Sequence, residues 1–72
     1  MREALIETRK KAGFTQEQIA NIVGIDRASY SHIERGSRTP SLEIAAKIAG
    51  TLNKAIEEIF LPSDVAIRHN NS

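Results

Sequence analysis

The stretch Gln16–Arg35, QEQIANIVGIDRASYSHIER, decides how this chain folds. It holds two short helical patterns, because apolar residues recur at intervals of three and four on either side of a central connection. The apolar positions are Ile19, Ile22 and Val23 before the connection and Tyr30 and Ile33 after it. Only Gly24-Ile25-Asp26 remains to join the two segments, so the second helix must leave the first at a steep angle.

The residues around this connection suit a tight turn. A sharp turn requires a positive φ, which Gly24 adopts without the steric penalty that a Cβ atom would bring. Two helices that cross at a steep angle approach closely, and Ala20 supplies a small side chain at the expected crossing point. Asp26 is a favourable N-cap residue for the second helix. We therefore predict two helices whose apolar faces pack together across the turn.

Start and stop signals place three more helices around this pair. Thr15 and Gln18 form a capping-box pattern before the first of the two helices, and Gly36 ends the second. Ser41 can cap a fourth helix, and Asn53 suits the left-handed turn that would close it. The predicted helices cover 5–12, 16–23, 27–35, 42–52 and 56–60, and the fourth is expected to turn Leu42, Ala45, Ile48, Ala49 and Leu52 inward. The predicted fold is an all-α, compact five-helix bundle.

The length and composition favour one small domain. For these 72 residues we predict a domain at 1–61 and a C-terminal tail at 62–72 that is flexible or contributes to dimerisation. The chain has no cysteine, so no disulfide or thiolate metal site can stabilise it. No apolar run approaches the roughly 20 residues that span a bilayer, and the N-terminal segment does not read as a signal peptide. These features predict a cytoplasmic protein without a membrane partner.

The residue inventory argues against an enzyme. The chain has two histidines, and it lacks a glycine-rich phosphate loop and any cluster with the spacing of metal ligands. We therefore predict no catalytic residue, no metal site and no cofactor.

Positive charge is concentrated in one part of the chain. Between Arg9 and Arg38 there are six basic and three acidic residues, whereas from Ser41 onward there are three basic and four acidic ones. Such an asymmetry is typical of a protein that directs one face at phosphate groups. The small aromatic content, 4%, disfavours binding of single strands or RNA by base stacking.

The helix predicted at 27–35, here called the recognition helix, has an outward face of short or polar side chains. This face consists of Arg27, Ala28, Ser31, His32 and Arg35, with Ser29 at its margin. Such a helix fits the major groove of duplex DNA, where each base pair presents a different donor and acceptor pattern. Arg27 suits guanine O6 and N7, which would discriminate by about 1–3 kcal/mol, and His32 can donate to a guanine acceptor. We assign base reading to Arg27, Ala28, Ser31 and His32, although Ser29 and Ser31 are equally compatible with a solvated position.

Other groups suit the DNA backbone, which fixes register without reading sequence. The backbone N–H of Gln16 begins a helix, where a phosphate is a natural ligand. A polar loop follows the recognition helix and suits a second phosphate. The assigned backbone contacts are Gln16, Arg35, Ser37, Arg38 and Thr39. Lys10 and Lys11 are better explained as solvated lysines than as a more distant contact.

The run from about Leu5 to Phe60 resembles the Cro/CI-type helix-turn-helix family, also called the xenobiotic-response-element family, of bacterial and phage transcriptional regulators. The resemblance rests on Arg9, GFTQEQIA at 13–20, VGI at 23–25, IERG at 33–36, PSLE at 40–43, KIA at 47–49 and IEEIF at 56–60. It implies a lambda-repressor-like DNA-binding domain in which the second and third helices form the helix-turn-helix. It also implies binding to palindromic operators, usually by dimers.

The resemblance also implies residue roles. The base-reading positions of the family fall on Arg27, Ala28 and His32, with Ser31 beside them, and its helix-two DNA contact falls on Gln16. An ion pair of the family falls on Arg9 and Glu34, tying the first helix to the third. The chain departs from the family pattern at Thr8, Tyr30, Arg35 and Ala55. Ala55 stands where a capping Ser or Thr is typical, so the last helix is weakly started.

We therefore predict a sequence-specific, double-stranded DNA-binding transcriptional regulator, most simply a repressor, that binds a palindromic operator as a homodimer. One module of this size contacts few base pairs, whereas two would meet successive major grooves about 34–36 Å apart. The predicted dimer contacts are Ile56, Ile59, Phe60, Leu61, Val65 and Ile67. The alternative is an antitoxin-type module that binds a partner protein as well as its own promoter.

Overall fold

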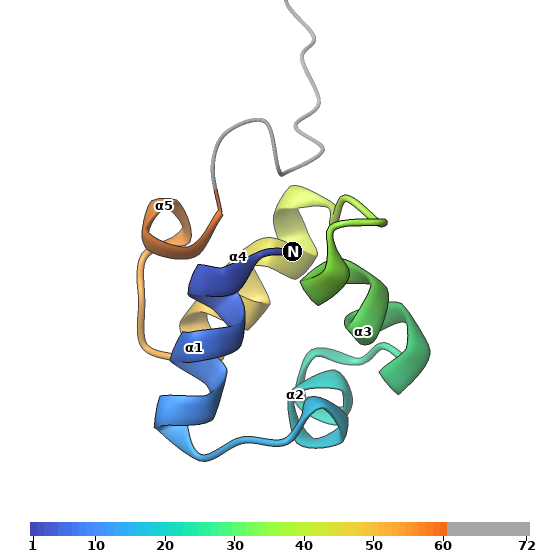
Figure 1. The fold of residues 1–72 in the computed structure, drawn as a ribbon, viewed down its shortest axis with the longest axis horizontal. Coiled ribbons are helices and arrows are strands. Elements are labelled where there is room, and N and C mark those ends of the chain that lie inside the picture. Colours follow the sequence, from blue (N-terminus) through green and yellow to red (C-terminus); the bar gives the residue numbers. More distant parts are fainter. Residues whose placement is uncertain (61–72) are drawn as a thin grey trace, which may run out of the picture.

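Five helices follow one another along residues 1–60, the part of the chain that the structure, a computed structural model, describes (Figure 1). They are α1 (Glu3–Ala12), α2 (Gln16–Val23), α3 (Arg27–Arg35), α4 (Leu42–Thr51) and α5 (Ile56–Ile59). No β-strand occurs within these 60 residues. The predicted all-α, five-helix fold is confirmed, with helix ends that differ from the predicted ones by no more than two residues.

The start signals of the helices act as predicted. Thr15 Oγ1 accepts a hydrogen bond of 3.1 Å from the Gln18 N–H, and Gln18 Oε1 accepts one of 2.9 Å from the Thr15 N–H. The side chains of Asp26 and Ser41 accept from backbone N–H groups in the first turns of α3 and α4. Ala55 offers no side-chain acceptor, so α5 begins without this bond, as its sequence predicts.

The turn between α2 and α3 has the predicted geometry. Gly24 has a φ of 85°, and the carbonyl of Ala20 accepts from the N–H groups of Gly24 and Ile25 at 2.9 and 3.0 Å. The Ala20 side chain is fully buried, so the small residue lies inside the packing, as expected for the crossing point. This turn fixes the direction of α3 relative to α2.

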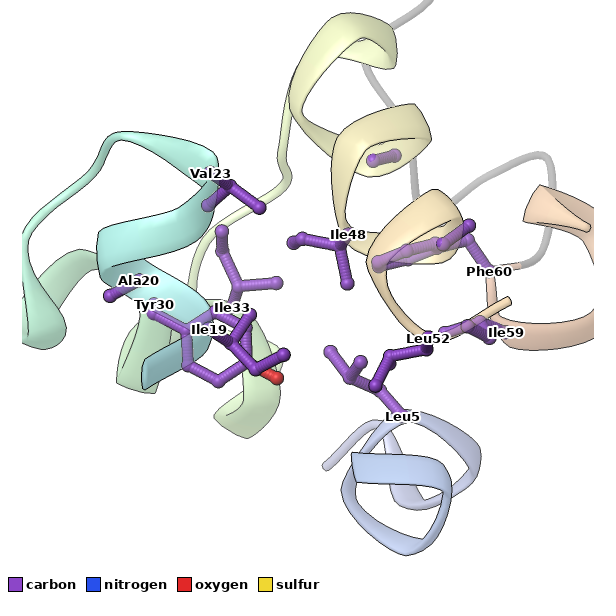
Figure 2. Packing of buried hydrophobic residues seen from close by; sticks show 12 residues of the cluster. Leu5, Ile19, Ala20, Val23, Tyr30, Ile33, Ile48, Leu52, Ile59 and Phe60 are labelled. Carbon is purple, nitrogen blue, oxygen red and sulfur yellow. The ribbon is translucent and has the colours of Figure 1, made fainter. Parts of the chain in front are cut away.

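The core lies where α2 and α3 face α1, α4 and α5 (Figure 2). Its buried apolar side chains are Leu5, Ile19, Ala20, Val23, Tyr30, Ile33, Ala45, Ile48, Ala49, Leu52, Ile59 and Phe60. Ile48 points from α4 toward Val23 and Ile33, whereas Leu5 approaches Leu52 from α1. Each buried Leu, Ile or Val side chain contributes about 1.5–3 kcal/mol. Every helix of the described part contributes at least one side chain to this core.

Two residues that the periodicity turned inward are exposed instead. Ile22 is 56% exposed and Leu42 is 44% exposed. Ile22 and Ala20 occupy opposite margins of the apolar stripe on α2, and the stripe turns its Ala20 side into the core. Leu42 is the first residue of α4 and lies at the margin of a stripe that is buried from Ala45 onward. The sequence prediction for these two positions is therefore wrong.

Candidate nucleic-acid interface

The two faces of α3 differ as the sequence predicts. Tyr30 and Ile33 are 0% and 3% exposed and pack in the core. On the opposite face Arg27, Ala28, His32 and Arg35 are exposed and Ser31 is half-buried. Helix α3 lies on the side of the bundle opposite α5 (Figure 1). The structure thus presents the residues assigned to base reading together, on the free side of one helix.

Ser29, at the margin of this face, has a structural partner on each side. Its Oγ donates to Asp26 Oδ1 at 2.7 Å and accepts from Arg38 Nη1 at 3.1 Å. The hydrogen bonds from the Ser29 side chain and backbone N–H hold the pKa of the Asp26 carboxyl below its usual value. Ser29 therefore joins the start of α3 to Arg38 in the loop that follows the helix. No spacing rule in the sequence signals this link, because nine residues separate Ser29 from Arg38.

His32 is oriented by Ser37, two residues beyond the end of α3. Ser37 Oγ lies 3.0 Å from His32 Nδ1 and also donates to the His32 carbonyl oxygen at 3.3 Å. The Ser37 hydroxyl can accept from an Nδ1–H group or donate to an unprotonated Nδ1, so the contact is compatible with either neutral tautomer of His32. The donor role assigned to His32 by the sequence analysis therefore stays a prediction.

Helix α3 also carries a buried carboxylate. Glu34 is 2% exposed, and its Oε2 atom accepts from Arg9 Nε at 2.6 Å and from the Tyr30 hydroxyl at 2.8 Å. Its Oε1 atom accepts from Gln16 Nε2 at 2.9 Å and from Arg9 Nη2 at 3.3 Å. The structure thus pairs Arg9 with Glu34, the residues to which the resemblance assigns an ion pair, and adds Gln16 and Tyr30 to the same group.

These donors keep the Glu34 carboxylate ionised inside the protein. Burial is the strongest influence and raises the pKa, but the hydrogen bonds from Arg9, Gln16 and Tyr30 together outweigh it and leave the pKa below its usual value. The hydrogen bond to Glu34 likewise raises the pKa of Arg9, and burial raises that of Tyr30. The charge network is therefore satisfied at neutral pH, with both partners ionised.

Gln16 has two separate roles in this geometry. Its side-chain amide turns toward Glu34, so this group helps to fix the start of α2 against α3. Its backbone N–H begins α2 and is the group that the sequence analysis assigned to a phosphate. The side-chain contact escaped sequence reasoning, because only the folding of α2 onto α3 brings residues 16 and 34 together.

The other residues assigned to the DNA backbone lie at the opposite end of α3. Arg35 is the last residue of the helix, and Ser37, Arg38 and Thr39 are exposed in the loop that leads to α4. Lys10 and Lys11 are exposed in the last turn of α1. Positive and polar groups therefore lie beside the exposed face of α3 at its C-terminal end, while the N-terminus of α2 provides a separate backbone N–H group.

Two of the predicted dimer contacts are buried in the core. Ile59 and Phe60 are 6% and 1% exposed and belong to the core of the protomer, so their side chains are not available to a partner without unpacking. This corrects their assignment, which followed from apolarity alone. Ile56 is half-buried. Leu61, Val65 and Ile67 lie outside the described residues.

The described part of the chain also bears on membrane and metal binding. No helix in residues 1–60 has the length and apolar character needed to span a membrane. Within the same residues no three His, Asp or Glu side chains are gathered in a way that would hold a metal ion.

Comparison with known proteins identifies relatives of this chain. A family model described as helix-turn-helix matches residues 5–59. An uncharacterized HTH-type transcriptional regulator of Archaeoglobus fulgidus is 42% identical over 64 residues, which cover 89% of this chain and 91% of that protein. Another, from Methanothermobacter thermautotrophicus, is 42% identical over 62 residues, or 85% of this chain and 90% of the relative. No solved structure gives a significant match.

One relative has a more specific name. The cryptic phage CTXphi transcriptional repressor RstR of Vibrio cholerae is 37% identical over 59 residues, which cover 82% of this chain and 53% of that protein. The matched segments of these relatives span most of residues 1–60, and therefore the helices that carry the exposed face of α3.

Proposed function

The chain belongs to the Cro/CI-type helix-turn-helix family of transcriptional regulators, and from this premise we propose that it represses transcription by binding a palindromic DNA operator as a homodimer. The observation that carries the proposal is the exposed polar face of α3, held on a core that leaves no large apolar group on that face. Such a helix fits the major groove with its side chains on base edges.

Base reading is proposed for four residues of α3 and the backbone contacts for its flanks. Arg27 suits a guanine, through a bidentate contact with O6 and N7. His32 suits a guanine acceptor, to which its ring can donate. Ala28 and Ser31 complete the face. The backbone contacts are the N–H of Gln16 and the side chains of Arg35, Ser37, Arg38 and Thr39.

Repression is supported by the name of one relative and by the simplicity of the mechanism. RstR is a repressor and shares 37% identity with this chain over 59 residues. A DNA-bound domain can block access of a polymerase without any further activity. We propose that this chain acts in the same way, through occupancy of its operator.

The homodimer is proposed because one α3 reaches only a short run of base pairs. Two copies related by a twofold axis would place their recognition helices in successive major grooves, about 34 Å apart. The proposed contact retains Ile56 and the segment from Leu61 onward, without Ile59 and Phe60. Sedimentation of the full chain and of an Ile56→Glu variant tests this contact, because a charge placed in a dimer interface weakens association. A full-chain monomer at operator-binding concentrations would refute it.

In vitro selection from a random duplex pool, at near-physiological salt, tests the function itself. The expected product is a near-palindrome with half-sites one helical turn apart. An Arg27→Ala, His32→Ala double variant is the matched control, and it should lose the motif while remaining folded. If the folded wild-type protein selects no motif, the proposal is wrong and a protein-binding role of the antitoxin type becomes the better reading.

A further inference from the structure

We propose that Arg2 is a positioning residue for DNA binding, which fixes the C-terminal end of α3 and the loop at 36–39; this role rests on the proposed function. Arg2 precedes α1 and is separated from α3 by more than 20 residues, so sequence patterns within the helix-turn-helix do not include it. Its hydrogen bonds to α3 and to the following loop go to backbone carbonyl groups. It acts on the backbone that carries the proposed phosphate contacts.

The first observation is that Arg2 supplies donors to the end of α3. The last carbonyl groups of an α-helix have no partner within the helix and need donors from elsewhere. The Arg2 backbone N–H donates to the Glu34 carbonyl at 2.8 Å, and Arg2 Nη1 donates to the Ile33 carbonyl. A positive charge at this end of a helix also interacts favourably with the partial negative charge of the helix dipole.

The second observation is that the same guanidinium reaches the loop after α3. Arg2 Nη1 also donates to the Arg38 carbonyl at 3.0 Å. One nitrogen therefore joins the backbone at residue 33 to the backbone at residue 38, across the turn that contains Gly36. The side chain of Arg38 in turn donates to Ser29, so the loop is held at both its backbone and its side chain.

The third observation is that Arg2 itself is anchored. Its guanidinium carbon lies 5.9 Å from the ring centroid of Phe60, a cation–π distance, and Phe60 is 1% exposed in the core. Its carbonyl accepts from the Ile6 N–H at 3.1 Å in the first turn of α1. Arg2 therefore connects the end of α3 to α1 and to the residue that follows α5. Figure 1 shows the N-terminus beside the C-terminal end of α3.

These contacts give Arg2 influence over specificity. Arg2 bridges the backbone that carries four of the proposed phosphate contacts, Arg35, Ser37, Arg38 and Thr39. Phosphate contacts set the register of the recognition helix on DNA. Loss of the bridge leaves the helix folded but frees its end relative to the bundle. Specific binding, which needs base and backbone contacts together, then falls more than non-specific binding.

The test compares Arg2→Gln and Arg2→Lys with Lys47→Gln, a control that removes one exposed positive charge from α4. All are measured at a temperature where circular dichroism shows each protein fully folded. Amide hydrogen exchange of Gly36, Ser37 and Arg38 is followed by NMR in the DNA-free proteins. Affinity is measured for the selected operator and for a random duplex.

Arg2→Gln should speed exchange of those three amides and weaken operator binding about tenfold, the change expected from one or two lost hydrogen bonds. Its random-duplex affinity should match that of Lys47→Gln, and Arg2→Lys should recover part of both losses, because it keeps the charge. Exchange rates and operator affinity equal to those of Lys47→Gln would overturn the proposal. So would an equal loss on both duplexes. If the wild-type protein selects no duplex, the proposed function fails; exchange then still reports whether Arg2 holds the end of α3.

Discussion

Arg9 Nε lies 2.6 Å from Glu34 Oε2, and this ion pair joins the last turn of α1 to the buried side of α3. Both side chains are at most 10% exposed, so little water screens the pair. Arg9 Nη1 also donates to the Phe14 carbonyl at 2.8 Å, which fixes the approach to α2. The pair therefore holds three helices in the arrangement that presents the α3 face.

Removing the arginine should destabilise the domain severely. An Arg9→Met variant leaves the Glu34 carboxylate buried without its cation, and such changes cost about 3–5 kcal/mol. Urea denaturation of wild type and variant measures this cost. Lys10→Met is the control, because the neighbouring Lys10 is exposed and its replacement should stay within about 0.5 kcal/mol. Equal midpoints for the two variants would mean that the ion pair contributes nothing.

Stability should fall in acid through Glu34. The usual pKa of this carboxyl is 4.5 and its folded pKa is lower, so the folded state favours the ionised form. That contribution is fully present above 4.5 and is lost as the pH falls through the folded value. Free energies of unfolding for wild type and Glu34→Gln, measured from neutral pH downward, should therefore converge in acid. A difference that stays constant across this range would contradict the assignment.

Tyr30→Phe should cost about 1–3 kcal/mol through the loss of one hydrogen bond to a buried carboxylate. The Tyr30 hydroxyl donates to Glu34 Oε2 at 2.8 Å, and the ring is fully buried, so the change deletes the donor and keeps most of the packing. Thermal or urea unfolding gives the cost. Operator affinity of the folded variant should remain that of wild type, since Tyr30 does not lie on the exposed face.

Arg27→Ala and Arg38→Ala should weaken binding in different ways. Loss of Arg27 should relax base preference at one position of each half-site, because Arg27 is assigned to a base edge. Loss of Arg38 should weaken all sequences similarly and reduce the salt slope by about one. Competition with single-base operator variants and salt titration distinguish the two effects. The reverse pattern would overturn the division between reading and backbone contacts.

Ser37→Ala should change the proton distribution on His32. Without the Ser37 oxygen, Nδ1 loses its partner at 3.0 Å, so the balance between the two neutral tautomers of His32 should change. Nitrogen chemical shifts of the imidazole in the DNA-free protein report the tautomer directly. Identical imidazole spectra for both proteins would refute the role of Ser37.

Local signals were sufficient for the helix caps and for the turn between α2 and α3. Thr15 and Gln18 cap each other across three residues, and Gly24 adopts the positive φ that its turn needs. The same reasoning failed at Ile22, because periodicity defines a stripe but not which margin of the stripe another helix covers. It failed again at Phe60, where apolarity cannot distinguish a core position from an interface.

The sequence by itself determined the five helices, the tight turn between α2 and α3, and the polar character of the outward face of α3. These follow from spacings within about ten residues, which backbone geometry translates directly into structure. Only the tertiary structure decided that Gln16 shares Glu34 with Arg9 and that Arg2 holds the end of α3. Side-chain hydrogen bonds require atoms within about 3 Å of each other, and the packing of helices on a common core decides which distant residues come that close.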